Sequence, residues 1–139
     1  MGTETLMILG SALLIGLVII LAVKLTRGRS GKLNVERFRA EWLKIENSID
    51  NKNSMTFQMA VLSADKLLDK AMRELGMIGE NMGDRLKNGK NRFSKIDAVW
   101  TAHKMRNRIA HETDVALNFL TLKKIMMIYK RALKDLGAI

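Results

Sequence analysis

One segment of the chain combines side chains that could carry out chemistry on a phosphate ester. Residues 98–112 read AVWTAHKMRNRIAHE and hold both histidines of the chain together with the pattern Arg106-Asn107-x-x-x-His111. Histidine exchanges protons near neutral pH, and the permanently charged arginine fork binds phosphate oxygens. The set suits attack by a ribose 2′-hydroxyl on the neighbouring phosphate, with His111 moving a proton, Arg106 stabilising negative charge and Asn107 orienting the phosphate or the histidine.

The same residues also have a structural interpretation. Polar side chains on a core-facing helical stripe must be hydrogen-bonded to one another or line a cleft. His103 in particular is of the kind usually found as a hydrogen-bonded core histidine that supports its neighbours. No metal site is expected, because His103 and His111 lie about 12 Å apart along a helix and the chain has no cysteine.

The spacing within the pattern raises a geometric problem. Residues five apart on an ideal helix are separated by about 140° around its axis, so Arg106 and His111 do not share a face. Either the helix is distorted at the pattern, or two chains each contribute part of one site.

Cations surround this segment and could bind the phosphate backbone of RNA without reading its sequence. Phe93 lies among them as a candidate ring for stacking on a base. The alternative interpretation is a solvated, glycine-rich loop. The candidate substrate-binding residues are Arg85, Lys87, Lys90, Arg92, Lys95, Lys104 and Arg108.

The pattern resembles the arginine, polar residue, histidine signature of the HEPN superfamily, whose members are small helical bundles and in many cases metal-independent ribonucleases. Four residues separate Arg106 from His111, and Asn107 stands where the family often has asparagine. The resemblance covers about residues 35–137. It implies a homodimer with its active site between the protomers, no cofactor, and a toxin or defence role in which an antitoxin or other regulatory protein could be a partner.

The elements that position these residues are predicted to be helices. The chain has no proline and ten methionines, and its apolar residues recur at helical spacing. Short polar connections between such segments favour an all-α fold, an antiparallel four-helix bundle. We expect helices over 35–49, from Asn53 or Ser54 to Gly76, from a Ser94-x-x-Asp97 capping box through the histidine segment, and from Thr113 or Asp114 to Gly137, with a short turn of helix near 82–87.

The N-terminal part is predicted to be a single transmembrane helix. Leu6 to Leu25 is almost wholly apolar and long enough to cross a bilayer. A cleaved signal peptide is disfavoured, because Glu4 is the only charge before the span and no Ala-x-Ala sequence follows it. The cations at the C-terminal flank of the span predict that the remainder lies in the cytoplasm and the N-terminus outside; they are Lys24, Arg27, Arg29 and Lys32.

The chain is therefore predicted to have four segments: an extracytoplasmic N-terminus (residues 1–5), the span (6–25), a basic linker (26–34) and the helical domain (35–139).

The chain carries a net charge of +10, which suits an anionic partner such as RNA or a lipid surface, although solubility alone could explain it. Three functions remain open: a membrane-anchored endoribonuclease, a non-catalytic HEPN-like binding or scaffolding module, and a purely structural membrane adaptor.

Overall fold

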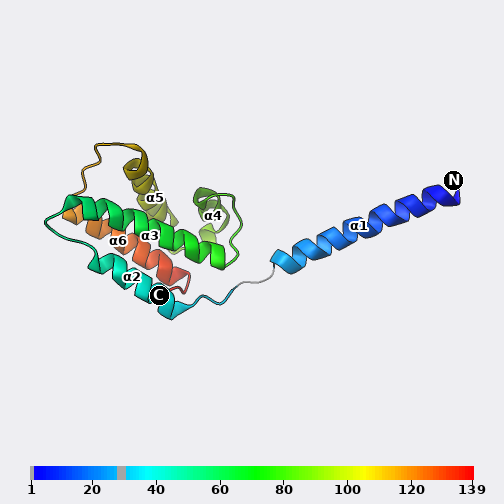
Figure 1. Ribbon diagram of the computed structural model, residues 1–139, viewed down its shortest axis with the longest axis horizontal. Coiled ribbons are helices and arrows are strands. Elements are labelled where there is room, and N and C mark those ends of the chain that lie inside the picture. Colours follow the sequence, from blue (N-terminus) through cyan, green and yellow to red (C-terminus); the bar gives the residue numbers. More distant parts are fainter. Residues whose placement is uncertain (1, 28–30) are drawn as a thin grey trace. The chain divides into compact units, whose positions relative to one another are not determined.

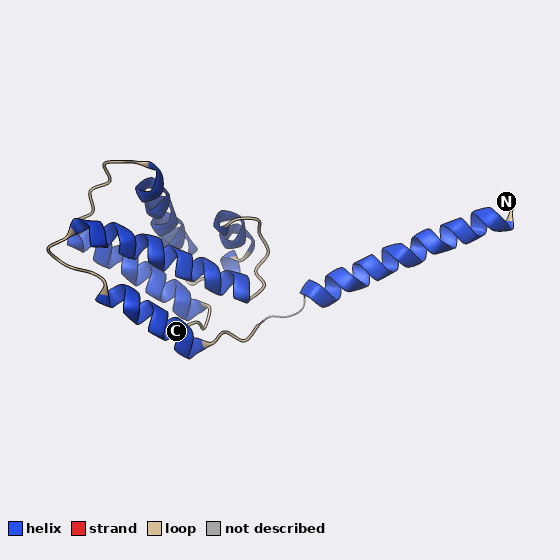
Figure 2. Ribbon diagram, in the orientation of Figure 1, coloured by secondary structure: helices blue, strands red, loops and turns tan. Residues whose placement is uncertain are grey.

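The computed structural model describes residues 2–27 and 31–139, and all of its regular elements in these ranges are helices (Figures 1 and 2). The chain divides into two compact units, Met1–Gly31 and Lys32–Ile139. The predicted linker includes residues 28–30, which lie outside the described residues.

The first unit is one helix, α1 (Thr3–Arg27), which begins three residues before the predicted span and ends two residues after it. Within it, Thr3–Ala22 has a mean hydropathy of 2.7 and is long and apolar enough to cross a membrane. A signal sequence near the N-terminus has the same properties, so the anchoring and the orientation of α1 stay predictions.

The first two helices of the second unit begin at asparagine caps. Asn34 precedes α2 (Val35–Asn47), and Asn53 precedes α3 (Ser54–Glu74), where its side chain accepts a hydrogen bond from the Met55 N–H. Such a cap satisfies a backbone donor that the first helical turn leaves unpaired. Gly76, which follows α3, has a φ of 69°, a left-handed conformation that glycine adopts without strain. The predicted N-cap of α3 at Asn53 and its predicted end at Gly76 are confirmed.

The start of the next long helix differs from the prediction. A short helix, α4 (Met82–Asn88), and a single turn, η1 (Lys90–Arg92), precede α5 (Ile96–His111). The predicted capping box at Ser94 is wrong, because the N-cap position is Lys95 and carries no side-chain cap. Ser94 instead donates from its backbone N–H and its hydroxyl to Asp135 Oδ2, at 2.8 and 2.7 Å.

The last helix, α6 (Phe119–Asp135), begins later than predicted. Its N-cap is Asn118, whose side chain accepts a hydrogen bond of 2.7 Å from the Thr121 N–H. The predicted N-caps, Thr113 and Asp114, are therefore wrong. Residues 112–118 form a loop that buries Val115, which explains why the apolar spacing resembled an earlier start. Gly137, with a φ of 70°, ends the helix as predicted.

The core of the second unit forms around α3, which packs against α2, α5 and α6, while α5 and α6 also pack on each other (Figure 1). Burial of large apolar side chains drives this packing. The largest fully buried side chains are Tyr129, Phe38, Leu68, Met72, Leu86, Leu122, Leu133 and Val61.

Candidate functional site

An open cleft of about 760 Å³ lies where α5 faces α3 and the start of α4. Its α5 wall carries three polar residues of the segment identified above, and its α3 wall carries carboxylates and one lysine. The lining residues used below are His103, Arg106, Asn107, Asp65, Asp69 and Lys66.

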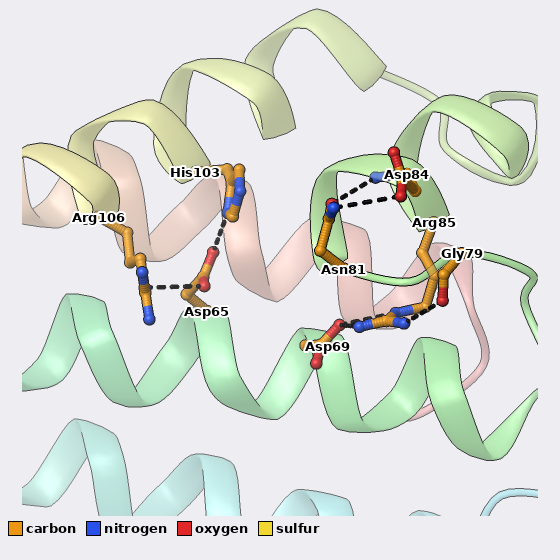
Figure 3. Close-up of polar contacts among 8 residues, drawn as sticks. All are labelled: Asp65, Asp69, Gly79, Asn81, Asp84, Arg85, His103 and Arg106. Carbon is orange, nitrogen blue, oxygen red and sulfur yellow. Dashed lines mark hydrogen bonds and ion pairs between the residues drawn. The ribbon is translucent and has the colours of Figure 1, made fainter. Parts of the chain in front are cut away.

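Asp65 of α3 is the centre of the polar contacts at this cleft and is only 4% exposed. Its Oδ1 lies 2.8 Å from His103 Nδ1 and accepts a hydrogen bond of 3.0 Å from the Tyr129 hydroxyl. Its Oδ2 lies 3.3 Å from Arg106 Nε (Figure 3). One buried carboxylate therefore joins side chains from three helices, α3, α5 and α6, and we call Asp65, His103, Arg106 and Tyr129 the Asp65 network.

The chemistry of the Asp65 network assigns its protons. Burial raises the pKa of Tyr129 far above its ordinary value, and the negative charge of Asp65 raises it further, so the hydroxyl stays protonated and donates. A carboxylate can only accept hydrogen bonds, so His103 Nδ1 also carries a proton. His103 thus has a partnered Nδ1 and a defined tautomer when neutral; it is a buried, hydrogen-bonded histidine, and its supporting role in the site stays a prediction.

Arg106 is held at the wall of the cleft from two sides. Its Nη1 donates to Asn107 Oδ1 at 3.0 Å, and its Nε is ion-paired with Asp65 without making a hydrogen bond to any described residue. The side chain is still 36% exposed. An arginine that is already oriented and partly open to solvent can bind an anion without first giving up rotamer freedom.

His111 is the last residue of α5, is exposed, and does not line the cleft. The helix is α-helical over its whole length, so no local change of helix type brings His111 toward Arg106. At about 100° per residue, His111 lies roughly a quarter turn from the centre of the cleft face and directly beyond Asn107, four residues earlier. Of the two explanations offered by the sequence, a distorted helix is wrong, and sharing between chains stays a prediction.

None of the predicted substrate-binding cations lines the cleft. Arg85 is 8% exposed and is held by Asp69 at 2.9 Å and by the Gly79 carbonyl at 2.7 Å, so its guanidinium ties α4 to α3 (Figure 3). Arg108 is exposed and paired with Glu112, whose hydrogen bonds and charge raise the pKa of Arg108. The remaining five are exposed: Lys87, Lys90, Arg92, Lys95 and Lys104.

Phe93 does not offer a ring for stacking, because it is 7% exposed and belongs to the core. That part of the prediction is wrong, for the reason that the ring lies at the turn between η1 and α5 and closes the packing there. Within the described residues, no group of three or more His, Asp or Glu side chains is placed to hold a metal ion.

Sequence reasoning did not identify Asp65 or Tyr129 as parts of the site. A signal was present for Asp65, since it is the one carboxylate among the apolar residues Val61, Ala64 and Leu68 of the α3 stripe. A charged residue at such a position is costly unless it is paired, so it indicates partners on another helix. Tyr129 gave no comparable signal, because a tyrosine on an apolar stripe is ordinary core.

No protein-family model matches the chain, and no curated protein or solved structure is significantly similar to it.

Proposed function

We propose that the protein is a membrane-anchored, HEPN-like endoribonuclease that cleaves RNA without a metal ion. The observation that carries the proposal is the placement of Arg106 and Asn107, hydrogen-bonded to each other on the accessible wall of a cleft, with His111 exposed at the end of the same helix. The packing of α2, α5 and α6 around α3 supports an antiparallel four-helix bundle of the HEPN type.

The proposed reaction is an internal transfer at one phosphate. The ribose 2′-hydroxyl loses its proton to a base, its oxygen bonds to phosphorus, and the bond to the 5′-oxygen of the next nucleotide breaks as that oxygen takes up a proton. The products are a 2′,3′-cyclic phosphate and a free 5′-hydroxyl. Arg106 stabilises the extra negative charge on the phosphate, and His111 transfers protons.

Two chains would share this work. In one chain the imidazole of His111 lies off the cleft face, and a second protomer with its α5 against the first would bring its own His111 to the Arg106 of its partner. Anchoring by α1 would favour such pairing, because it confines the chains to a plane and raises their effective concentration. The exposed Lys104 lies on the same helix and would contact the RNA backbone.

The first experiment measures RNA cleavage by the full chain in detergent, in the presence of EDTA. The expected result is cleavage with 2′,3′-cyclic phosphate ends, and none of an RNA carrying a 2′-deoxy substitution at the cut position. His111→Ala and Arg106→Ala should each abolish it. Lys104→Ala separates RNA binding from the chemical step, because it removes an exposed α5 side chain outside the cleft and should raise KM while leaving kcat nearly unchanged.

A complementation test addresses the shared site. In a mixed dimer of an Arg106→Ala chain and a His111→Ala chain, one of two shared sites has both an intact arginine and an intact histidine. Activity should therefore return when the two inactive chains are dissociated, mixed and reassembled. If each site used residues of a single chain, every site in the mixed dimer would be defective and the mixture would stay inactive.

A second function is favoured by the Asp65 network itself. His103 and Arg106 are both paired with a buried carboxylate of their own chain, as expected where such residues stabilise a fold. A non-catalytic HEPN-like module would bind RNA or a protein partner on its basic surface without cutting it. Binding of RNA by the folded parent dimer, with no cleavage of a broad RNA panel, would favour this function over the nuclease.

A further inference from the structure

The outward side of α6 combines exposed cations with exposed apolar residues. At about 100° per residue, six residues fall within an arc of roughly 100° opposite the buried side of the helix. All six are exposed, including Leu120 at 62% and Met127 at 57%. We call this set the α6 outer face; it consists of Leu120, Lys123, Lys124, Met127, Arg131 and Lys134.

The charge of the α6 outer face is almost wholly positive. The one acidic residue of α6 is Asp135, which lies 3.3 Å from Arg131 and accepts from Ser94. No carboxylate among the described residues pairs with Lys123, Lys124 or Lys134. Unpaired lysines beside two exposed apolar side chains, Leu120 and Met127, complement an anionic bilayer surface, which attracts cations and takes up apolar groups.

A groove beside the α6 outer face adds to this pattern. It has a volume of about 470 Å³ and lies between the start of α5 and α6. Apolar side chains form most of its lining, among them Val99, Met127 and Ile128. Its charged lining residues are three cations, Lys95, Lys124 and Arg131, and one carboxylate, Asp135, which is paired with Arg131. A shallow apolar groove with cations at its edge complements a phospholipid, whose anionic headgroup is joined to apolar chains.

We propose that the α6 outer face docks on the anionic phospholipid surface of the membrane in which α1 is anchored. The inference rests on the anchoring of α1 and does not require ribonuclease activity. Only residues 28–34 separate α1 from α2, and seven residues reach at most about 25 Å, so the second unit would stay near the headgroups. RNA is the less suitable occupant, because the α6 outer face has no aromatic ring to stack on bases while its aliphatic side chains gain by leaving water.

Docking in this way would leave the cleft free. The face of α6 that carries Tyr129 packs toward α3 and α5, and none of the described α6 residues lines the cleft. The α6 outer face therefore points away from Arg106. A docked domain would present its cleft to the cytoplasm, where a long anionic substrate would not be repelled by the lipid headgroups.

The test uses the full chain reconstituted in vesicles of phosphatidylcholine alone or mixed with phosphatidylserine. Because the chain has no cysteine, Met127→Cys gives a single site for a polarity-sensitive fluorophore. Met59→Cys on α3 is the matched control, with 56% exposure against 57% for Met127. Flotation with phosphatidylcholine vesicles checks the anchoring of α1 separately from docking.

The label at Met127 should shift to the blue and be quenched by lipid-attached quenchers only when phosphatidylserine is present, and the label at Met59 should do neither. Neutralising three cations of the α6 outer face should lower the ratio of docked to undocked domain by on the order of 100-fold, at about fivefold per lysine. These variants are Lys123→Gln, Lys124→Gln and Lys134→Gln together. The charge-matched control is Arg39→Gln, Lys44→Gln and Lys52→Gln, at exposed positions on and after α2.

Three results would overturn the proposal. One is a Met127 label that reports water in both kinds of vesicle although the chain floats with them. Another is an equal loss of docking in the two triple variants, which would reduce the effect to overall charge. The third is a triple α6 variant that keeps its lipid contact but loses affinity for RNA, which would assign the α6 outer face to nucleic acid.

Discussion

Removing the carboxylate of Asp65 should change the effect of a second substitution in the same network. Tyr129→Phe deletes one hydroxyl and leaves the ring, which is fully buried, in place. In the parent it removes a hydrogen bond of 3.0 Å to a charged, buried acceptor. Such a bond contributes about 2 kcal/mol to the free energy of unfolding, so Tyr129→Phe should destabilise the parent by that amount.

In an Asp65→Ala background the same substitution should have no cost. Asp65→Ala leaves the hydroxyl of Tyr129 and the Nδ1–H of His103 buried without their acceptor, and two such donors cost about 2–6 kcal/mol together. The lost ion pair to Arg106 adds to this cost, because Asp65 and the Nε of Arg106 are both buried, although the side chain of Arg106 as a whole is 36% exposed. Adding Tyr129→Phe then removes an unpaired polar group, so it should be neutral or stabilising. The coupling energy between the two positions should be about 2 kcal/mol or more.

The assay is equilibrium unfolding in urea, followed by tryptophan fluorescence. Both tryptophans, Trp42 and Trp100, lie in the second unit, so the signal reports that unit even in detergent-solubilised full chain. If Asp65→Ala is too unstable to measure, Asp65→Asn replaces it; its amide oxygen can still accept, and the coupling should be smaller. Equal costs of Tyr129→Phe in both backgrounds, within about 0.5 kcal/mol, would refute the shared carboxylate as the link between the helices.

Three further predictions use the same unfolding assay. The pKa of Tyr129 is raised in the folded state above its ordinary value of 10.0, so the unfolded chain loses this proton first as the pH rises. The free energy of unfolding of the parent should therefore fall above about pH 10, by about 1.4 kcal/mol for each pH unit. Tyr129→Phe lacks this proton and should not show that additional fall. Burial acts to raise the pKa of Asp135, but the hydrogen bonds from Ser94 and the charge of Arg131 leave it below its ordinary value of 3.8. Ser94→Ala should therefore cost about 1–2 kcal/mol at neutral pH and progressively less as the pH falls through the folded pKa of Asp135; a cost independent of pH would contradict this. Gly79→Ala should cost about 1–3 kcal/mol, because its methyl group would lie 2.5 Å from the Arg85 backbone nitrogen, whereas Gly83→Ala, with its nearest contact at 3.2 Å, should cost less.

Local signals predicted the elements whose boundaries depend on local contacts. Asn53 caps α3 through a backbone N–H two residues away, and Gly76 ends it through its own φ, so both could be predicted from nearby residues. Ser94 misled the prediction because its partner is Asp135, 41 residues further along the chain. Val115 misled it because a buried loop residue and a buried helical residue have the same apolar character. The errors fall where tertiary packing, and not the local sequence, decides the outcome.

In the candidate site, too, the sequence predicted what local spacing decides and missed what tertiary packing decides. His103, Arg106 and Asn107 share a face of α5 by spacing alone, and that face does line the cleft. Asp65, 38 residues before His103, decides which of these side chains is paired inside the fold. No spacing rule in the sequence relates Asp65 to His103. A carboxylate on an apolar stripe shows that a partner exists but does not say which helix supplies it.

The Asp65 network also bears on where His111 lies relative to the cleft. Pairing with both His103 and Arg106 sets the rotation of α5, because the two residues are three apart and meet the same carboxylate. With that rotation set, the helical repeat places His111 about a quarter turn off the cleft face. The contact that orients Arg106 toward the cleft therefore also keeps His111 of the same chain away from it. We propose that a nuclease using both residues takes one from each of two chains, and restored activity in the mixed dimer is the result expected from this proposal.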